Sequence, residues 1–286
     1  MHLVRRTLLT PLFCVLVLLS TFAVASAHTS GTSSPVIPCK QPPPGIDWSQ
    51  QSDAVLMSYG LPTHAMIGND PKKWANFAHL GKHTCDSKPN KNNKHSHPSA
   101  NTTSQPAWSG WWATNYTRGY FTEADSNFYV PTVKSCGGNT QTNASDWVGV
   151  GGVDTSPEVL VHAGVAVESD YNDITGQCDT TVTPWYEVAP NESQQDWRIS
   201  GVNQNTYMYA LISSNEGGDG YDYFFVGVVN GNYASTYDYS SSDLSDSEFG
   251  ECILERNANQ YGITKDLMDF SPDTFENCEL TGGSNP

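Results

Sequence analysis

Basic residues are scarce in this sequence. Its 286 residues include 14 Lys and Arg against 30 Asp and Glu, a formal net charge of −16 at pH 7. Nucleic acid and anionic membranes would repel such a protein, so neither is expected as a partner. After residue 27 the sequence also lacks any apolar run long enough to span a bilayer. An excess of carboxylates is typical of proteins that work at low pH or that use the charge for solubility.

Closely spaced cysteines are also absent. The seven cysteines are widely and irregularly separated and form no C-x-x-C pair, so no metal site built on sulfur is expected. Six of them follow residue 27, an even number that permits up to three disulfides and leaves their pairing open. These six are Cys39, Cys85, Cys136, Cys178, Cys252 and Cys278.

The first 27 residues have the pattern of a secretory signal. Arg5 and Arg6 precede an apolar stretch from Leu8 to Val24, and small residues ending at Ala27 form a cleavage site. A retained membrane anchor is the alternative, but polar residues and a proline interrupt the apolar stretch. The sequence therefore predicts a secreted protein, cleaved after Ala27 and not attached to the membrane.

Charge divides the remaining chain at about residue 106. Residues 28–105 carry seven Lys and four acids, whereas residues 106–286 carry five basic residues and 26 acids. The stretch from Lys88 to Gln105 has the composition of a solvated linker. Helical patterns are confined to Ser52–Leu80, where Asn69-Asp70-Pro71 would cap a short helix. Helices this short cannot form a core alone, so we expect them to dock by charge on the acidic domain.

Residues 106–286 have the pattern of an all-β domain. Short runs rich in Val, Tyr, Phe, Trp and Thr alternate with Gly, Asn, Asp and Ser, and no helical intervals separate them. This pattern predicts a sandwich or barrel of antiparallel strands, preceded by the short helical segment. The expected strands are Trp111–Asn115, Ser126–Val133, Trp147–Val150, Val159–Val167, Trp185–Val188, Thr206–Ser213, Tyr221–Val229 and Cys252–Glu255.

Six short motifs follow one another along these strands. They are Ser109–Ala113, Phe128–Thr132, Trp147–Gly152, Val159–Val165, Trp185–Pro190 and Glu251–Glu255. In this order they resemble the glutamic peptidases of the eqolisin family, whose landmarks include W-V-G-I-D-G, L-Q-x-G, W-Y-E-W-Y-P and a late E-x-x-x-E strand. The resemblance covers about residues 108–256, and Leu56–Pro62 resembles the segment before the catalytic domain in bacterial relatives.

The resemblance implies a fold, an activity and a processing scheme. The fold would be a two-sheet β-sandwich of the concanavalin A-like jelly-roll type. The activity would be that of an acid endopeptidase acting on polypeptide substrates. Residues 28–105 would be the pro-segment and linker of a zymogen, released by autoprocessing between Lys88 and Gln105 in acid. Such a mechanism needs only a carboxylate, a hydrogen-bond donor and water, so no cofactor is expected, and we expect a monomer.

The resemblance also assigns site residues. Glu255 would be the catalytic general base on the attacking water, four residues from Glu251 on the same strand face. The family glutamine that positions this water is replaced by His162, and a family aspartate is replaced by Gly151. A protonated His162 would still donate to an oxyanion, and strand alternation predicts that it lies on the exposed sheet face. The residues expected to line the cleft and bind substrate are Trp147, Glu187, Glu251 and Trp185.

Two other functions fit the same residues. Loss of the glutamine and the aspartate would also suit a non-catalytic, lectin-like binding module whose tryptophans hold a polysaccharide or peptide. A glycosidase that uses the paired carboxylates of Glu251 and Glu255 is the third reading.

Overall fold

The computed structural model describes residues 37–85, 108–114, 121–136, 142–152, 159–189, 193–214, 221–239, 249–256, 266–267, 269–270 and 274–282. The chain divides into two compact units, Met1–Ser33 and Ser34–Pro286, and every described residue belongs to the second. The predicted signal and the linker from Lys88 to Gln105 therefore lie outside the described residues. Within the described ranges, no helix is long and apolar enough to cross a membrane.

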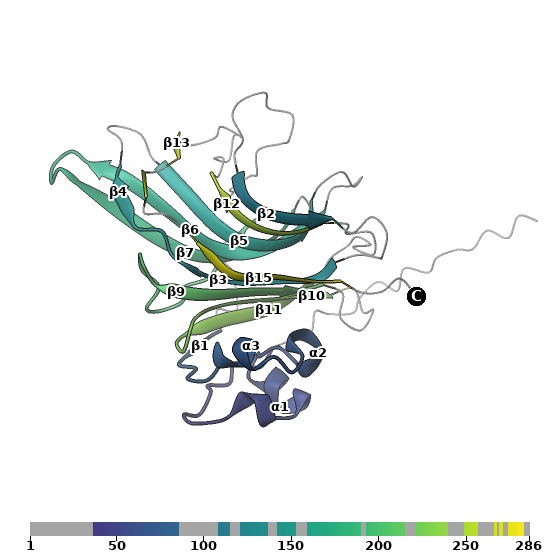
Figure 1. The fold of residues 1–286 in the computed structure, drawn as a ribbon. Coiled ribbons are helices and arrows are strands. Elements are labelled where there is room, and N and C mark those ends of the chain that lie inside the picture. The colour runs from purple at the N-terminus through teal and green to yellow at the C-terminus, as the bar shows by residue number, and fades with distance from the viewer. Residues whose placement is uncertain are drawn as a thin grey trace, which may run out of the picture. The chain divides into compact units, whose positions relative to one another are not determined.

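Two large sheets stack face to face (Figure 1). The strand order is β1-β11-β10-β9-β3-β15 in one sheet and β2-β12-β5-β6-β7-β8 in the other, with β13 beside β5. Of the pairings between described strands, only β1–β11 and β13–β5 are parallel. The predicted all-β sandwich is confirmed. The strands are β1 (His83–Thr84), β2 (Trp108–Thr114), β3 (Phe121–Tyr129), β4 (Val133–Ser135), β5 (Thr142–Gly151), β6 (Leu160–Asn172), β7 (Gln177–Ala189), β8 (Gln195–Asp196), β9 (Tyr207–Ser213), β10 (Tyr221–Val228), β11 (Tyr233–Tyr239), β12 (Phe249–Glu255), β13 (Asp266–Leu267), β14 (Asp269–Phe270) and β15 (Phe275–Gly282).

The main core lies between the two sheets. Successive side chains of a strand point to opposite faces, so alternate apolar residues meet across the sandwich. In the seven-stranded sheet these include Val161, Ala163 and Val165 of β6, and in the six-stranded sheet Ile212 and Phe224, all fully buried. Complete burial of a side chain such as Val or Ile contributes roughly 1.5–3 kcal/mol, so this layer contributes strongly to the stability of the sandwich.

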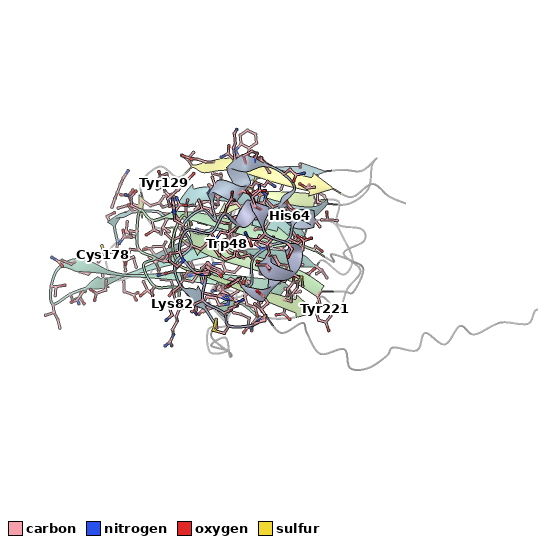
Figure 2. All side chains as sticks on the ribbon, turned by 90° about the horizontal axis from the view of Figure 1, so that it is seen from below. Trp48, His64, Lys82, Tyr129, Cys178 and Tyr221 are labelled. Carbon is pink, nitrogen blue, oxygen red and sulfur yellow. A yellow bond between two sulfur atoms is a disulfide. The ribbon has the colours of Figure 1, made fainter. Side chains whose placement is uncertain are left out.

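The β6–β7 hairpin extends well beyond the predicted strands. Pairing continues from Leu160–Ala189 out to Asn172–Gln177, and the disulfide Cys136–Cys178 lies near the tip, where Figure 2 labels Cys178. This tip is half-exposed and polar, so it has no apolar alternation by which its strands could have been predicted. The other disulfides are Cys39–Cys85 and Cys252–Cys278, so the three bridges permitted by the cysteine count all form.

The N-terminal segment consists of η1 (Trp48–Gln50), α1 (Asp53–Ser58), α2 (His64–Ile67), α3 (Pro71–Ala75) and β1. The predicted cap is confirmed, because the Asp70 side chain accepts from the Lys72 amide and Pro71 opens α3. The helices pack on the outer face of the six-stranded sheet, below β10 and β11 in Figure 1, and Figure 2 shows Trp48 and His64 in front of that sheet. The expectation of docking by charge was incomplete, since a large apolar cluster forms this contact.

One buried ion cluster accompanies the apolar contact. Lys73 Nζ of α3 lies 2.9 Å from Glu123 Oε1, 2.6 Å from Asp125 Oδ2 and 3.3 Å from Glu279 Oε2. Lys73, Glu123 and Asp125 are all buried. The charge attraction between the two parts of the chain is thus concentrated in one desolvated site, where each charge depends on its partners.

Two groups at this contact respond to acid in opposite directions. Burial raises the pKa of Asp125 to about 6 despite the charge of Lys73. The neutral carboxyl group is therefore favoured in the folded state, and the stabilisation that it provides is lost as pH rises from 3.8 to about 6. Burial lowers the pKa of His83 to about 4. The neutral imidazole is therefore favoured in the folded state, and the stabilisation that it provides is lost as pH falls from 6.5 to about 4. Each contribution is on the order of 3 kcal/mol. The two effects oppose each other as pH falls, so acid both stabilises and destabilises this contact.

Urea denaturation at pH 4, 5 and 6.5 tests this balance. In the parent protein the two effects oppose each other, so its free energy of unfolding should change less with pH than that of either variant. His83→Phe leaves only the Asp125 contribution, so stability should fall as pH rises. Asp125→Asn leaves only that of His83, so stability should fall as pH drops. The same pH slope in both variants would contradict the assignment.

Candidate active site

The outer face of the seven-stranded sheet carries a row of polar residues in register. Gly149 of β5 pairs with Glu251 of β12 on one side and with His162 of β6 on the other, and His162 pairs with Glu187 of β7. Trp112 of β2 pairs with Glu251 and ends the row. Glu251, His162 and Glu187 are 4%, 0% and 5% exposed, so the sheet holds three ionisable side chains out of water.

His162 lies at the centre of this face. Its Nε2 is 3.3 Å from Glu187 Oε2. Its ring centroid is 5.1 Å from that of Trp147 and 4.9 Å from that of Trp185. Strand alternation correctly predicts the face, but the expected exposure is wrong, because the two indoles and the neighbouring carboxylate cover the imidazole completely.

Each indole is anchored by its ring N–H. Trp147 Nε1 donates to Glu255 Oε2 at 2.9 Å, and Trp185 Nε1 donates to Ser145 Oγ at 3.0 Å. Glu255 and Ser145 are themselves paired across β12 and β5. Ser145 is a positioning residue that the sequence analysis missed. The only sequence feature that could have identified Ser145 is its position two residues before Trp147, which places both side chains on the same face of the strand.

The register separates the two glutamates of β12. Glu251 shares the row of His162, and only Gly149, which has no side chain, stands between them. Two strand spacings put their backbones roughly 10 Å apart. The edge of the Trp147 indole and the Leu160 side chain lie over Gly149 in this gap. Glu255 lies four residues further along, roughly 13 Å from that row. The structure thus aligns Glu251 with His162 and does not align Glu255, whose predicted role as general base stays a prediction.

There is also a steric reason for a glycine at position 149. A Cβ there would lie 2.9 Å from Trp147 Cζ3 and 3.1 Å from His162 Cβ, too close for an unstrained contact. Gly151, where the family has an aspartate, has φ +98°, a conformation that L side chains rarely adopt. The backbone therefore excludes an unstrained carboxylate at Gly151 and leaves the face to Glu251, Glu187 and Glu255.

The tryptophans do not form an open platform. Trp147 and Trp185 are 3% and 0% exposed, whereas Trp111 and Trp112 on the edge strand β2 are 74% and 52% exposed. The binding-module alternative needs tryptophans that are available to a ligand. Two of these four are instead structural walls around His162.

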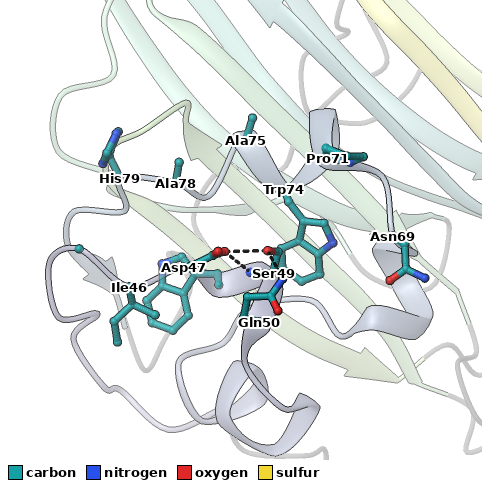
Figure 3. Close-up of a pocket in the computed structure, with 12 residues that line it drawn as sticks. Ile46, Asp47, Ser49, Gln50, Asn69, Pro71, Trp74, Ala75, Ala78 and His79 are labelled. Carbon is teal, nitrogen blue, oxygen red and sulfur yellow. Dashed lines mark hydrogen bonds between the residues drawn. The ribbon is translucent and has the colours of Figure 1, made fainter.

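A separate cavity of about 600 Å³ lies in the N-terminal segment between η1 and α3 (Figure 3). Its walls include Trp48, Trp74 and Asn69. It belongs to the segment on the six-stranded sheet, so it is distinct from the row around His162. Across the described ranges, no three His, Cys, Asp or Glu side chains are grouped so as to hold a metal ion.

A buried imidazole between carboxylates on one face of a β-sandwich defines a site suited to acid–base hydrolysis by protein side chains. Residues 106–286 match the Peptidase A4 family, and the chain belongs to this family of peptidases. The predicted resemblance to the eqolisins is confirmed, and the protein is a hydrolase.

Among solved structures, the chain is similar to scytalido-glutamic peptidase bound to a transition-state analogue inhibitor, at 18% identity over 62% of this chain and 81% of that one, with a TM-score of 0.48. It is also similar to SCP-B, an eqolisin in complex with the tripeptide Ala-Ile-His, at 17% identity over 63% and 81%, with a TM-score of 0.45. Aspergilloglutamic peptidase from Aspergillus niger matches at 20% identity over 45% and 69%, with a TM-score of 0.33. No curated protein matches the chain.

Proposed function

We propose that this peptidase is a secreted acid endopeptidase in which a glutamate of β12 activates water and His162 stabilises the oxyanion. The register of Glu251, Gly149 and His162 carries the proposal. It places a carboxylate and an imidazole in one row on the same face of the sheet, with the edge of the Trp147 indole over the glycine between them. A water molecule activated by Glu251 would attack the scissile carbonyl of a peptide bound on this face.

The reaction then needs no group outside the chain. The ionised carboxylate of Glu251 takes a proton from water as the oxygen attacks the carbonyl carbon. His162 is fully buried, so the bound substrate must first displace a side chain that covers it. A protonated His162 then donates a hydrogen bond to the carbonyl oxygen as this oxygen gains negative charge. The proton held by Glu251 passes to the departing amine as the C–N bond breaks, which restores the carboxylate.

The surrounding residues hold His162 in place. Glu187 lies 3.3 Å from Nε2, where an ionised carboxylate pairs with the ring if the ring is protonated. Trp147 and Trp185 fix the ring plane from two sides. In this scheme Glu255 orients Trp147 through its indole N–H, and substrate contacts fall to the more exposed Trp112 at the end of the row.

Secretion and a pro-form belong to the same proposal. Three disulfides are consistent with an oxidising, extracellular compartment. The signal pattern of residues 1–27 supports export, and the composition from Lys88 to Gln105 supports cleavage there in acid.

Substitution of His162 tests its role. His162→Ala removes the donor and should lower kcat on a denatured protein substrate at pH 3–4 by about 10²- to 10³-fold. His162→Gln replaces the imidazole with an amide donor and should keep most of the activity. Because an amide does not titrate, the pH profile of kcat should lose whatever limb His162 contributes.

Two results would contradict this role. Full activity in His162→Ala would remove His162 from the mechanism. An inactive parent that gains activity as His162→Gln would show that the imidazole has disabled the site. Far-UV circular dichroism should be unchanged in each variant.

A further inference from the structure

The N-terminal segment and the sheet beneath it share one apolar core. Phe77, fully buried, contacts Tyr209 of β9 and Phe225 of β10 at ring-centroid distances of 5.6 and 5.2 Å. The cluster joins nine buried residues of the segment to five of the sheet. They are Trp48, Leu56, Tyr59, Leu61, Met66, Ile67, Trp74, Phe77 and Leu80, with Tyr209, Leu211, Tyr223, Phe225 and Tyr233. Without the segment, a mostly aromatic sheet face would meet water.

Buried polar groups are matched across the same contact. The Gly60 carbonyl oxygen accepts from Tyr223 Oη at 2.8 Å and from Ser235 Oγ at 2.6 Å. The Tyr59 carbonyl oxygen accepts from Tyr233 Oη at 2.5 Å. All of these bonds are buried, so removal of the segment would leave three hydroxyl groups of the sheet without their acceptors.

The segment also extends the sheet. β1 pairs in parallel with β11, and the His83 ring stacks on Tyr233 at 4.6 Å. The disulfide Cys39–Cys85 closes the segment on itself, and the other two bridges lie within the sandwich. No disulfide therefore ties the segment to the sandwich, and the linker is its one covalent connection.

The position of the segment decides whether it could block the site residues. It packs on the outer face of the six-stranded sheet, whereas the row of Glu251, His162 and Glu187 lies on the outer face of the seven-stranded sheet. The main core separates these two faces (Figure 1). The described residues 37–85 thus do not cover the row of site residues.

We propose that residues 37–85 are a permanent structural partner of the sandwich, which stays bound as a second chain after the linker is cut. The segment protects the β9–β10–β11 face and does not act as a detachable inhibitor. This goes beyond the proposed function and does not depend on it, because binding of the segment can be measured without peptidase activity.

The test uses the full mature chain with a site-specific protease sequence inserted between Asn93 and Lys94. After cutting is confirmed on a denaturing gel, the native protein is passed through a size-exclusion column. Both fragments should elute together in equal amounts from pH 4 to 7. A small fragment that elutes alone, while the large one stays soluble and folded, would overturn the proposal.

A matched pair of glycines tests the contact itself. Gly60 and Gly68 both have φ +68°, so alanine strains the backbone at each position. At Gly60 the new Cβ would lie 2.5 Å from Ser235 Oγ and 2.6 Å from His83 Cε1, whereas at Gly68 nothing lies within 4 Å. In the cut protein, Gly60→Ala should separate the fragments and Gly68→Ala should not. Equal behaviour of the two variants would refute a tight contact at Gly60.

If uncut Gly60→Ala does not fold, Tyr233→Phe provides a milder change. It removes one buried hydroxyl group and keeps the ring. In the cut protein it should lower the urea concentration at which the fragments dissociate, relative to Tyr171→Phe on the exposed hairpin. No difference between these two variants would count against the contact.

Discussion

Glu251→Gln is expected to lower kcat/KM for a denatured protein substrate in acid by about 10²- to 10⁴-fold, the range that general-base catalysis supplies. The substitution keeps the size of the side chain and its place between Trp112 and Gly149, but an amide cannot take a proton from water. Because Glu251 is 4% exposed, bulk water cannot readily replace it as the base. Initial rates between pH 2 and 5 measure the effect.

Glu255→Gln is the matched control on the same strand. A glutamine at this position can still accept the Trp147 N–H, whose bond to Glu255 is 2.9 Å. The walls around His162 should therefore persist, and the loss of activity should be much smaller than in Glu251→Gln. The opposite ranking would return the general base to Glu255, as the family resemblance predicts. Equal large losses would mean that the two carboxylates act together.

Strand periodicity predicted the sandwich but not all of its edges. The core strands β5, β6, β9 and β10 contain runs of Val, Ile and aromatic residues and were anticipated near their observed positions. β11 and β15 were not. β11 reads Tyr-Ala-Ser-Thr-Tyr-Asp-Tyr and owes its place to β10 and to the segment packed on it, and β15 is largely polar along one edge. Tertiary contacts, which local sequence does not encode, decide such strands.

The sequence predicted which residues form the site but not which of them lie side by side across the strands. Parity correctly placed Glu251 and Glu255 on one face of their strand and His162 on the outer face of its sheet. It gave no information on which glutamate faces His162, because that depends on the register between β12, β5 and β6. Burial of His162 was equally inaccessible, since it results from the anchoring of Trp147 and Trp185 on neighbouring strands.

Lys73→Met is expected to destabilise the protein by about 3–5 kcal/mol at pH 7, the typical effect of leaving a buried charge without its partner. Lys73 is 8% exposed, and its ammonium group is the cation that faces both Glu123 and Asp125. Methionine fills a similar volume, so packing on Glu123 and Asp125 changes little. The loss should therefore be mainly electrostatic, and urea denaturation measures it.

The pH dependence of this loss of stability shows whether its cause is electrostatic. The pKa of Asp125 is about 6 in the presence of Lys73, and removal of that positive charge raises it further. At pH 4 the carboxyl group of Asp125 is then neutral, one buried charge disappears, and Lys73→Met should cost less than at pH 7. Lys72→Met removes an exposed lysine one position away and should have little effect at either pH. If Lys73→Met destabilised the protein equally at both pH values, lost packing of α3 would be the cause, and the ion cluster would contribute little to holding the N-terminal segment on the sheet.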